Sequence, residues 1–169
     1  MQLMRSELKR KKETMNQVNA IEINKDEDEV KNEKVKALQN HLELDKDEVN
    51  EITLEDGECF HYGDKEYLVL TDDEADEKAK DYIKDSAWAF NSSFLASHSK
   101  GDVDEEIFKC LSEKCESSND AILSLIKDVD HFVDDAISSD GRGHFMSTYD
   151  GCENEEEINK NTYYIYRTN

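Results

Sequence analysis

The chain changes from a strand pattern to a helix start within one stretch, Tyr67-Leu68-Val69-Leu70-Thr71-Asp72-Asp73-Glu74. Residues 67–70 are apolar and β-prone, and the Thr-x-x-Glu pattern that follows them is typical of a capping box at a helix N-terminus. A second β-prone run, residues 59–62, lies just upstream, and Gly63 with Asp64 between the two runs favours a hairpin turn. The stretch therefore predicts a β-hairpin that leads directly into a helix.

Helical spacing of apolar residues continues downstream. The first helix is expected to extend as far as Phe90, and a second is expected over residues 103–115 with Ile107, Phe108 and Leu111 facing inward. The clearest pattern covers residues 122–137, where apolar residues recur at i, i+3, i+4 and i+7 and predict one amphipathic helix. Upstream, the very polar residues 25–51 contain only a weak helical pattern.

The C-terminus carries two β-prone segments. Residues 144–149 and 162–167 are strand candidates, and the acidic residues 150–160 are expected to join them as a loop. Together with the hairpin and the helices, these segments predict an α+β fold: three or four helices on a small antiparallel sheet, with an N-terminal helical arm.

Charge divides the chain into two parts. The 169 residues carry 42 acidic and 21 basic side chains, a net charge of −21, yet residues 1–25 are net basic. We therefore expect a charged, partly helical N-terminal extension over residues 1–55 and a compact acidic domain over residues 56–169. We expect no direct nucleic-acid binding by this acidic domain. Proteins that bind nucleic acid gain affinity by neutralising phosphates with basic side chains.

A short apolar seam runs through the N-terminal extension. Its members follow a 4–7–3 spacing: Met4, Leu8, Met15 and Val18. A helix of about two heptads is marginal alone, so one interpretation is that the seam docks on a partner or forms a homodimer. The other two interpretations are a frayed, solvated arm and nucleic-acid contact through the basic residues 9–12.

The sequence has no feature that directs it to a membrane or out of the cell. No run of about 18 apolar residues is present, and residues 1–13 lack the apolar segment of a secretory signal. The cysteines show no paired spacing typical of a zinc site and are expected to be reduced thiols: Cys59, Cys110, Cys115 and Cys152. A cytosolic protein without membrane association is therefore expected.

Several short segments resemble a group of small bacteriophage proteins that have no established activity. They are Asp140-Gly141-Arg142-Gly143-His144-Phe145, Ser147, Tyr149-Asp150-Gly151 and Tyr163-Tyr164-Ile165-Tyr166-Arg167, together with Tyr67-Leu68-Val69-Leu70-Thr71-Asp72 and Trp88-Ala89-Phe90-Asn91. The likeness covers about residues 60–169. It implies a phage or mobile-element origin, and hence the cytosol of a bacterial host, without implying a particular activity.

The segment Asp140-Gly141-Arg142-Gly143-His144 allows two interpretations. The glycines can let backbone N–H groups converge on an anion, with Arg142 binding phosphate through both ends of its guanidinium and His144 moving a proton near neutral pH. Alternatively, a helix ends at Gly141, a strand begins at Gly143, and Arg142 pairs with nearby carboxylates. The second interpretation is purely structural.

No catalytic or cofactor-binding pattern accompanies this segment. The sequence contains no Gly-x-Ser-x-Gly elbow, no Walker or GxGxxG loop and no HExxH pair. Residues 150–157 lack the alternating ligands of an EF-hand, so a solvated acidic loop is favoured over a cation site. We therefore predict a protein that is not an enzyme and that holds no cofactor and no metal.

The acidic surplus is the main indication of function. A net charge near −24 over residues 26–169 exceeds the magnitude of about 2–8 that solubility needs. Carboxylates at i and i+4 on a helix lie about 5–6 Å apart, so the surface can present rows of negative charge as duplex DNA does. The expected partner-binding residues are Asp72, Asp73, Asp76, Glu77, Asp128, Asp134, Asp135, Glu153, Glu155, Glu156 and Glu157.

These observations predict a phage-encoded inhibitor of a host defence enzyme that processes nucleic acid, of the anti-CRISPR or antirestriction type. Its partner is expected to be a host nuclease or CRISPR effector with a basic channel, which the acidic surface occupies as a DNA mimic. Two alternatives are a phosphate- or nucleotide-binding module using Arg142 and His144, and a regulatory protein that self-assembles through its N-terminal helix. An inert acidic coat is a further one, because lysines such as Lys78 and Lys80 interrupt the acidic surface.

Overall fold

A computed structural model describes residues 28–55 and 58–169 of the chain. The predicted seam, which comprises Met4, Leu8, Met15 and Val18, lies outside the described residues. Within them, an antiparallel sheet is packed against helices, which confirms the predicted α+β class.

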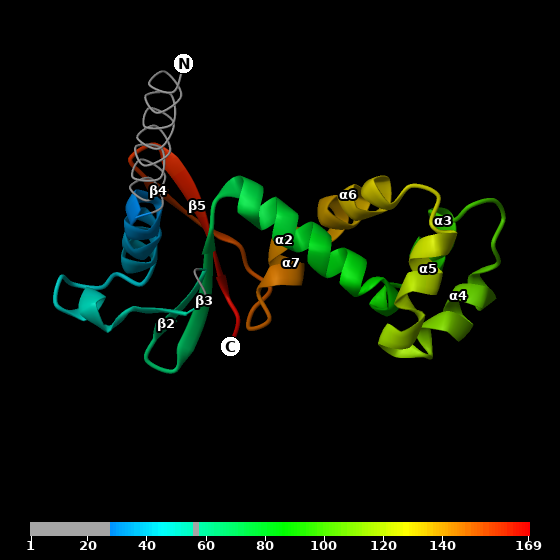
Figure 1. The fold of residues 1–169 in the computed structure, drawn as a ribbon, viewed down its shortest axis with the longest axis horizontal. Helices are drawn as coiled ribbons and strands as arrows, with labels where there is room; N and C mark the ends of the chain where they lie inside the picture. Colours follow the sequence, from blue (N-terminus) through cyan, green and yellow to red (C-terminus); the bar gives the residue numbers. More distant parts are fainter. Residues whose placement is uncertain (1–27, 56–57) are drawn as a thin grey trace, which may run out of the picture.

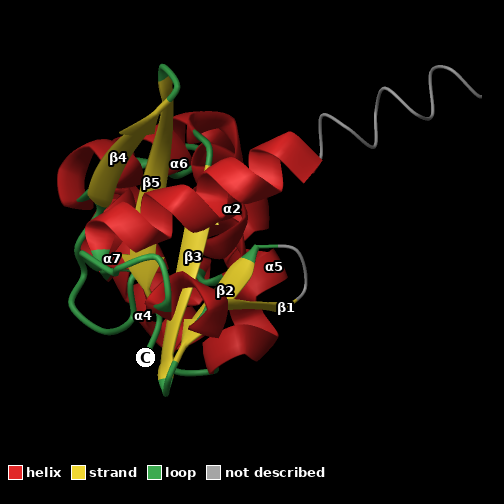
Figure 2. Ribbon diagram, turned by 90° about the vertical axis from the view of Figure 1, so that its left-hand side faces the viewer, coloured by secondary structure: helices red, strands yellow, loops and turns green. Residues whose placement is uncertain are grey.

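Five strands form one antiparallel sheet: β1 (Thr53–Glu55), β2 (Cys59–Tyr62), β3 (Lys65–Leu70), β4 (Asn154–Ile158) and β5 (Asn161–Arg167). Their order across the sheet is β1-β2-β3-β5-β4, as Figure 2 shows. The predicted hairpin is present, since Tyr62 pairs with Lys65 across a turn in which Gly63 has a φ of 64°. The strand latest in sequence, β5, therefore lies inside the sheet, and β1 and β4 are its edges.

Helix α2 (Asp72–Asp85) begins at the predicted capping box. The Thr71 hydroxyl accepts a hydrogen bond from the Glu74 amide, and the Glu74 carboxylate accepts one from the Thr71 amide at 2.7 Å. The helix ends at Asp85 rather than near Phe90, and a 3₁₀ turn follows it. The other elements are η1 (Glu48–Glu51), η2 (Ala87–Ala89), α3 (Ser92–Ser97), α4 (Glu105–Ser112), η3 (Cys115–Ser118), α5 (Asn119–Leu125), α6 (Val129–Asp140) and α7 (Arg142–Met146).

Helices cover both faces of the sheet (Figure 1). On one face, Val69 of β3 shares a core with Leu38 of the helix over residues 28–41. On the other face, Leu70 shares a second core with α2, α6 and α7. Successive side chains of a strand point to opposite faces. Because both faces of β3 are buried, all four residues of the run 67–70 are apolar.

The predicted helix over residues 122–137 is two helices, α5 and α6. Ile126 between them is extended and forms an isolated bridge with Ser99, and the Asp128 carboxylate accepts a hydrogen bond from the His131 amide at the start of α6. The apolar spacing continues across the break because both helices bury residues in the same core. The prediction of one continuous helix was therefore wrong.

Two further predictions near the C-terminus were wrong. The expected strand over residues 144–149 begins inside the short helix α7, and the expected acidic loop contains strand β4. Three successive glutamates are poor strand formers, but pairing with β5 outweighs this preference, and the edge position leaves Glu155 and Glu157 exposed.

Ile107 was also expected to face inward, and its side chain is 48% exposed.

Residues 28–55 belong to the same packed body as residues 58–169. β1 pairs with β2, and the helix over residues 28–41 contributes Ala37 and Leu38 to the core that contains Phe60. The boundary predicted between residues 55 and 56 thus falls between two paired strands. None of the described helices is long and apolar enough to cross a membrane.

Glu33 anchors the helix over residues 28–41 to the far end of the sheet. Its carboxylate accepts hydrogen bonds from Asn159 and Asn161 at 2.8 Å and from the Tyr163 hydroxyl at 2.7 Å. The hydrogen bond from Asn161 contributes most to a pKa of Glu33 below its usual value of 4.5. Burial and the bond to Glu33 raise the pKa of Tyr163 well above the ordinary range.

We expect Glu33→Gln to lower the free energy of unfolding by about 2 kcal/mol at pH 7, because hydrogen bonds to a charged acceptor are lost. A carboxyl whose pKa is lowered by folding stabilises the fold above its unfolded pKa of about 4.3, and this contribution is lost as pH falls through the lower folded value. The difference between wild type and variant should therefore shrink when urea unfolding is repeated near pH 3. Glu29→Gln, an exposed position on the same helix, serves as the control. A difference that does not change with pH would contradict the assignment.

Candidate functional site

The Arg142 side chain lies at the centre of an ion network. Its guanidinium donates two hydrogen bonds to Glu153 of the segment leading into β4, at 2.9 and 3.1 Å. It donates two more to Asp72 and Asp76 of α2, at 2.8 and 2.9 Å. The guanidinium also stacks over the Tyr164 ring, 4.2 Å from its centroid. The side chain is only 11% exposed, so the carboxylates occupy the positions that a bound phosphate would need.

Hydrogen bonds to carboxylates hold the Arg142 guanidinium in its charged form. Burial alone would lower the pKa of Arg142, but hydrogen bonds to Glu153 and Asp72 outweigh burial and raise the pKa above its usual value. The Tyr166 hydroxyl donates a 2.5 Å hydrogen bond to Glu153. Burial, followed by this hydrogen bond, raises the pKa of Tyr166 far above the ordinary range. Both groups therefore hold their protons and act as permanent donors.

The glycines beside Arg142 have separate structural roles. Gly141 ends α6 with a φ of 76°. Gly143 lies against the chain that leads into β4, so that a Cβ atom there would be 2.6 Å from the Gly151 carbonyl oxygen. The ion network and the contact of Gly143 with residues 151–153 together hold α7 against α2 and the chain before β4. The arrangement favours the structural interpretation of the segment over the anion-binding one, although Gly143 lies in a helix and does not begin a strand.

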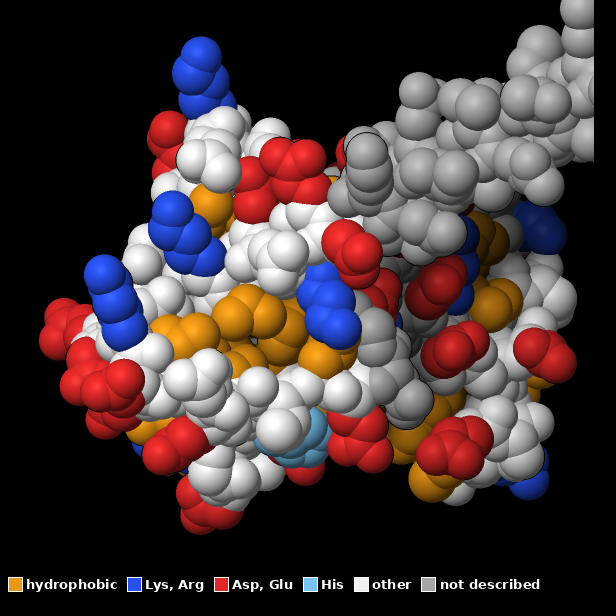
Figure 3. Space-filling model, turned by 60° about the vertical axis from the view of Figure 1, so that its left-hand side comes forward, with side chains coloured by type: hydrophobic (Ala, Val, Ile, Leu, Met, Phe, Trp, Pro, Cys, Tyr) orange, Lys and Arg blue, Asp and Glu red, His pale blue; other side chains and the backbone are white. Residues whose placement is uncertain are grey.

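The expected partner-binding carboxylates are divided among different environments. Three surround Arg142, one lies 3.0 Å from His98 Nε2, and one caps α6: Asp72, Asp76 and Glu153, then Asp135, then Asp128. The others form no side-chain interaction with the described residues: Asp73, Glu77, Asp134, Glu155, Glu156 and Glu157. Figure 3 shows that on one face of the molecule the acidic side chains form separate groups, with basic and apolar surface between them. The predicted residues are therefore divided between carboxylates that pair within the protein and carboxylates that face solvent.

A shorter row of carboxylates follows the exposed side of α2. Its members are Asp73, Glu77, Asp81 and Asp85, all exposed and spaced four residues apart. Each step rises about 6 Å along the helix axis, because an α-helix rises about 1.5 Å per residue. None of the four side chains forms an ion pair or hydrogen bond with the part of the chain that the structure describes. We call these four residues the α2 acidic row; the sequence prediction included its first two members and missed Asp81 and Asp85.

An open pocket with aromatic walls adjoins the C-terminal end of this row. It has a volume of about 410 Å³ and is lined by Tyr82 and Ser86 beside the row, by Asp140 and His144, and by a group of phenylalanines. The Phe90 ring stacks with its neighbours at centroid distances of 5.8 and 6.0 Å. His144 thus lines this pocket, whereas Arg142 lies in the ion network. The remaining aromatic lining residues are Phe90, Phe94 and Phe145.

The chain matches no protein-family model, and no curated protein or solved structure is significantly similar to it. A functional conclusion therefore rests on the residues and their geometry.

Proposed function

We propose that this protein binds another protein through the α2 acidic row, which docks in a cationic groove that otherwise holds nucleic acid. The observation that supports this most directly is the row itself: four exposed carboxylates spaced four residues apart on one helix, without a cationic partner among the described residues. Elsewhere on the same helix, cations do neutralise carboxylates, since Asp72 and Asp76 pair with Arg142.

Unpaired charge of one sign is suited to fast and selective association. Complementary potentials steer two proteins together and suppress encounters with partners of the same sign. Exposed charges contribute little to residence time, and buried aromatic or apolar anchors usually supply it. The pocket lined by Tyr82 and Phe90 lies at the end of the row and can accept such an anchor from the partner.

The class of partner is the one that the charge pattern favours: a nuclease with a basic channel, such as a CRISPR effector or a restriction enzyme of a bacterial host. Occupying such a channel makes the protein an inhibitor without any catalytic step of its own. The phosphate-binding alternative is less well supported, because Glu153, Asp72 and Asp76 already engage the guanidinium of Arg142.

The test is competition between the full chain and fluorescent duplex DNA for a purified CRISPR effector nuclease and a purified restriction enzyme. We expect wild type to displace DNA at low salt and to lose affinity steeply toward about 0.5 M NaCl. The row variant, with Asp73→Asn, Glu77→Gln, Asp81→Asn and Asp85→Asn, should bind about tenfold more weakly, since four exposed charge contacts of a few tenths of a kcal/mol each sum to about 1.4 kcal/mol.

The matched control removes four other exposed carboxylates that form no ion pair or side-chain hydrogen bond with the described residues: Asp102→Asn, Glu113→Gln, Glu116→Gln and Asp120→Asn. Its net charge equals that of the row variant, so a loss confined to the row variant places the contact on α2. Equal losses of affinity in both variants would mean that net charge determines binding, and would reject the α2 acidic row as the contact. Salt-insensitive binding, or no binding to either enzyme, would reject the proposal.

A further inference from the structure

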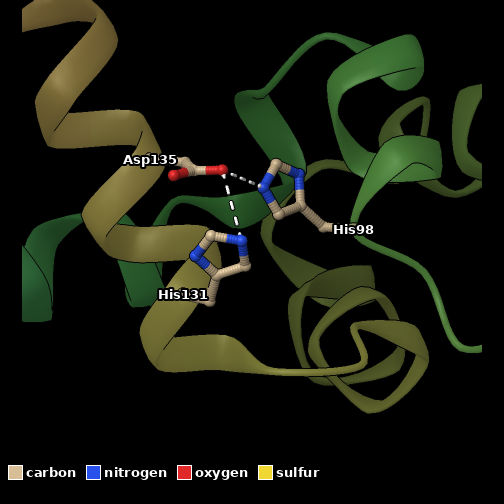
Figure 4. Close-up of side chains that lie close together, drawn as sticks. All are labelled: His98, His131 and Asp135. Carbon is tan, nitrogen blue, oxygen red and sulfur yellow. Dashed lines mark hydrogen bonds and ion pairs between the residues drawn. The ribbon is translucent and has the colours of Figure 1, made fainter.

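Two histidines and an aspartate converge at the junction of α3 and α6 (Figure 4). His98 is the residue directly after α3 and caps it, while His131 and Asp135 lie one turn apart on α6. His98 Nε2 lies 3.0 Å and His131 Nε2 3.6 Å from the Asp135 Oδ2 atom. One ligand atom from each of the three residues lies within 4.8 Å of the other two.

The surrounding structure fixes the orientation of His98. Its Nδ1 atom lies 2.9 Å from the Phe94 carbonyl oxygen and 3.1 Å from the Ser97 hydroxyl. The carbonyl can only accept, and the hydroxyl, which donates to that carbonyl, can accept as well, so we assign the hydrogen to Nδ1. The ring packs against Phe94 and Phe132 at centroid distances of 4.6 and 5.6 Å, and its side chain is 10% exposed. In the neutral ring, Nε2 therefore directs a lone pair at the other two residues. Metal-binding histidines commonly donate their second ring N–H to a carbonyl in this way.

The contact between His98 and Asp135 requires a positive species. A carboxylate oxygen and an imidazole lone pair are both acceptors, so a separation of 3.0 Å is favourable only with a proton or a cation between them. The pocket around the three residues is also lined by Lys127 and Asp128, one of each sign. His131 lies near the same carboxylate oxygen, so one divalent cation between the three residues would supply positive charge to both imidazoles and to the carboxylate at once.

The spacing fits a small transition-metal ion. Tetrahedral Zn²⁺ with bonds of about 2.0–2.1 Å holds its ligands about 3.3 Å apart, and the two distances to Asp135 lie on either side of this value. The His131 side chain is 67% exposed and is free to turn toward the other two. Two nitrogens and one oxygen are donors that suit zinc and its neighbours in the first transition row.

We propose that His98, His131 and Asp135 bind a divalent transition-metal ion of the zinc type, with the remaining coordination positions open to solvent. The sequence predicted no metal, because only the His131–Asp135 pair is close in sequence and His98 lies 33 positions before it. The site is separate from the α2 acidic row and does not depend on the proposed function.

The test uses the full chain without a histidine tag, stripped of metal and kept reduced. Titration calorimetry with ZnCl₂ should give one site per chain, and addition of ZnCl₂ should raise the melting temperature. His131→Gln, which alters an exposed side chain, should weaken Zn²⁺ binding about tenfold or more and abolish most of the thermal shift. Asp135→Asn should do the same.

His144→Gln is the matched control, because His144 is exposed and lies outside the cluster. Binding that is lost in His131→Gln and Asp135→Asn but kept in His144→Gln supports the site. Wild type that binds no Zn²⁺, or binds it as tightly after His131→Gln, would overturn it. Titration with Co²⁺ adds a second check, since absorption typical of thiolate ligation would place the metal on cysteines and likewise overturn the proposal.

Discussion

Replacing Arg142 by methionine is expected to destabilise the protein by about 3 kcal/mol. The change leaves Glu153 and Asp76 without a counter-charge while keeping much of the side-chain volume. Removing one partner of a buried ion pair usually costs about 3–5 kcal/mol, and the lower end applies because the Asp72 and Asp76 side chains are 66% and 48% exposed. For a chain of this size, that loss lowers the melting temperature by about 6–12 °C.

Arg167→Met provides the comparison for Arg142→Met. Arg167 also lies over an aromatic ring, 3.4 Å from the Tyr149 centroid, but forms no ion pair with the described carboxylates. We expect it to cost less than about 1 kcal/mol. A double-mutant cycle with Glu153→Gln should show coupling between residues 142 and 153. Similar losses from Arg142→Met and Arg167→Met in urea unfolding would mean that the ion network adds nothing beyond stacking.

Substituting Gly143 by alanine should cost about as much, for a different reason. The added Cβ would lie 2.6 Å from the Gly151 carbonyl oxygen and 2.8 Å from the Glu153 amide nitrogen. These are backbone atoms that cannot rotate away, so relief requires α7 or the chain before β4 to move. Overpacking of this kind typically costs about 1–3 kcal/mol, and here the movement also pulls Glu153 from Arg142. We therefore expect about 3 kcal/mol.

Gly101→Ala separates steric overlap from the ordinary penalty for losing a glycine. Gly101 has a φ of 73° and no neighbour within 4 Å of an added Cβ, so its substitution should cost only about 1–2 kcal/mol through the backbone conformation. Chemical unfolding at pH 7 gives both values. If Gly143→Ala is as stable as Gly101→Ala, the close approach of α7 to the chain before β4 is not rigid.

The part of the fold that follows from local sequence was predictable. Gly63 in a two-residue turn and the Thr71–Glu74 capping box are short-range signals, and both predicted elements are present. The other predictions were wrong because contacts with residues distant in sequence outweighed local preference. The acidic residues 150–160 predict a loop, whereas pairing with β5 determines the extended conformation of residues 154–158. The break between α5 and α6 has one local signal, Asp128 as an N-cap, which the continuous apolar spacing concealed.

The candidate sites were predictable only where one element carries them. The first half of the α2 acidic row was named because it follows the capping box, and the same i+4 spacing would have found Asp81 and Asp85. Pairing of Arg142 with carboxylates is one of the two interpretations that the sequence allows. The sequence does not identify the partners, because they lie about 70 positions upstream and 11 downstream of Arg142. The cluster of His98 with Asp135 joins two helices that no sequence spacing brings together.

The position of β5 inside the sheet has a consequence for biosynthesis. Ninety residues separate the end of β3 from the start of β5. At a translation speed of about 5–20 residues per second, the hydrogen-bonding edge of β3 waits about 5–20 s for its partner to leave the ribosome. During that interval the nascent β1–β3 meander exposes an unpaired edge, a template for wrong pairing between chains. Expression yield should therefore depend on chaperone supply and on elongation rate through this interval more than on the stability of the finished protein.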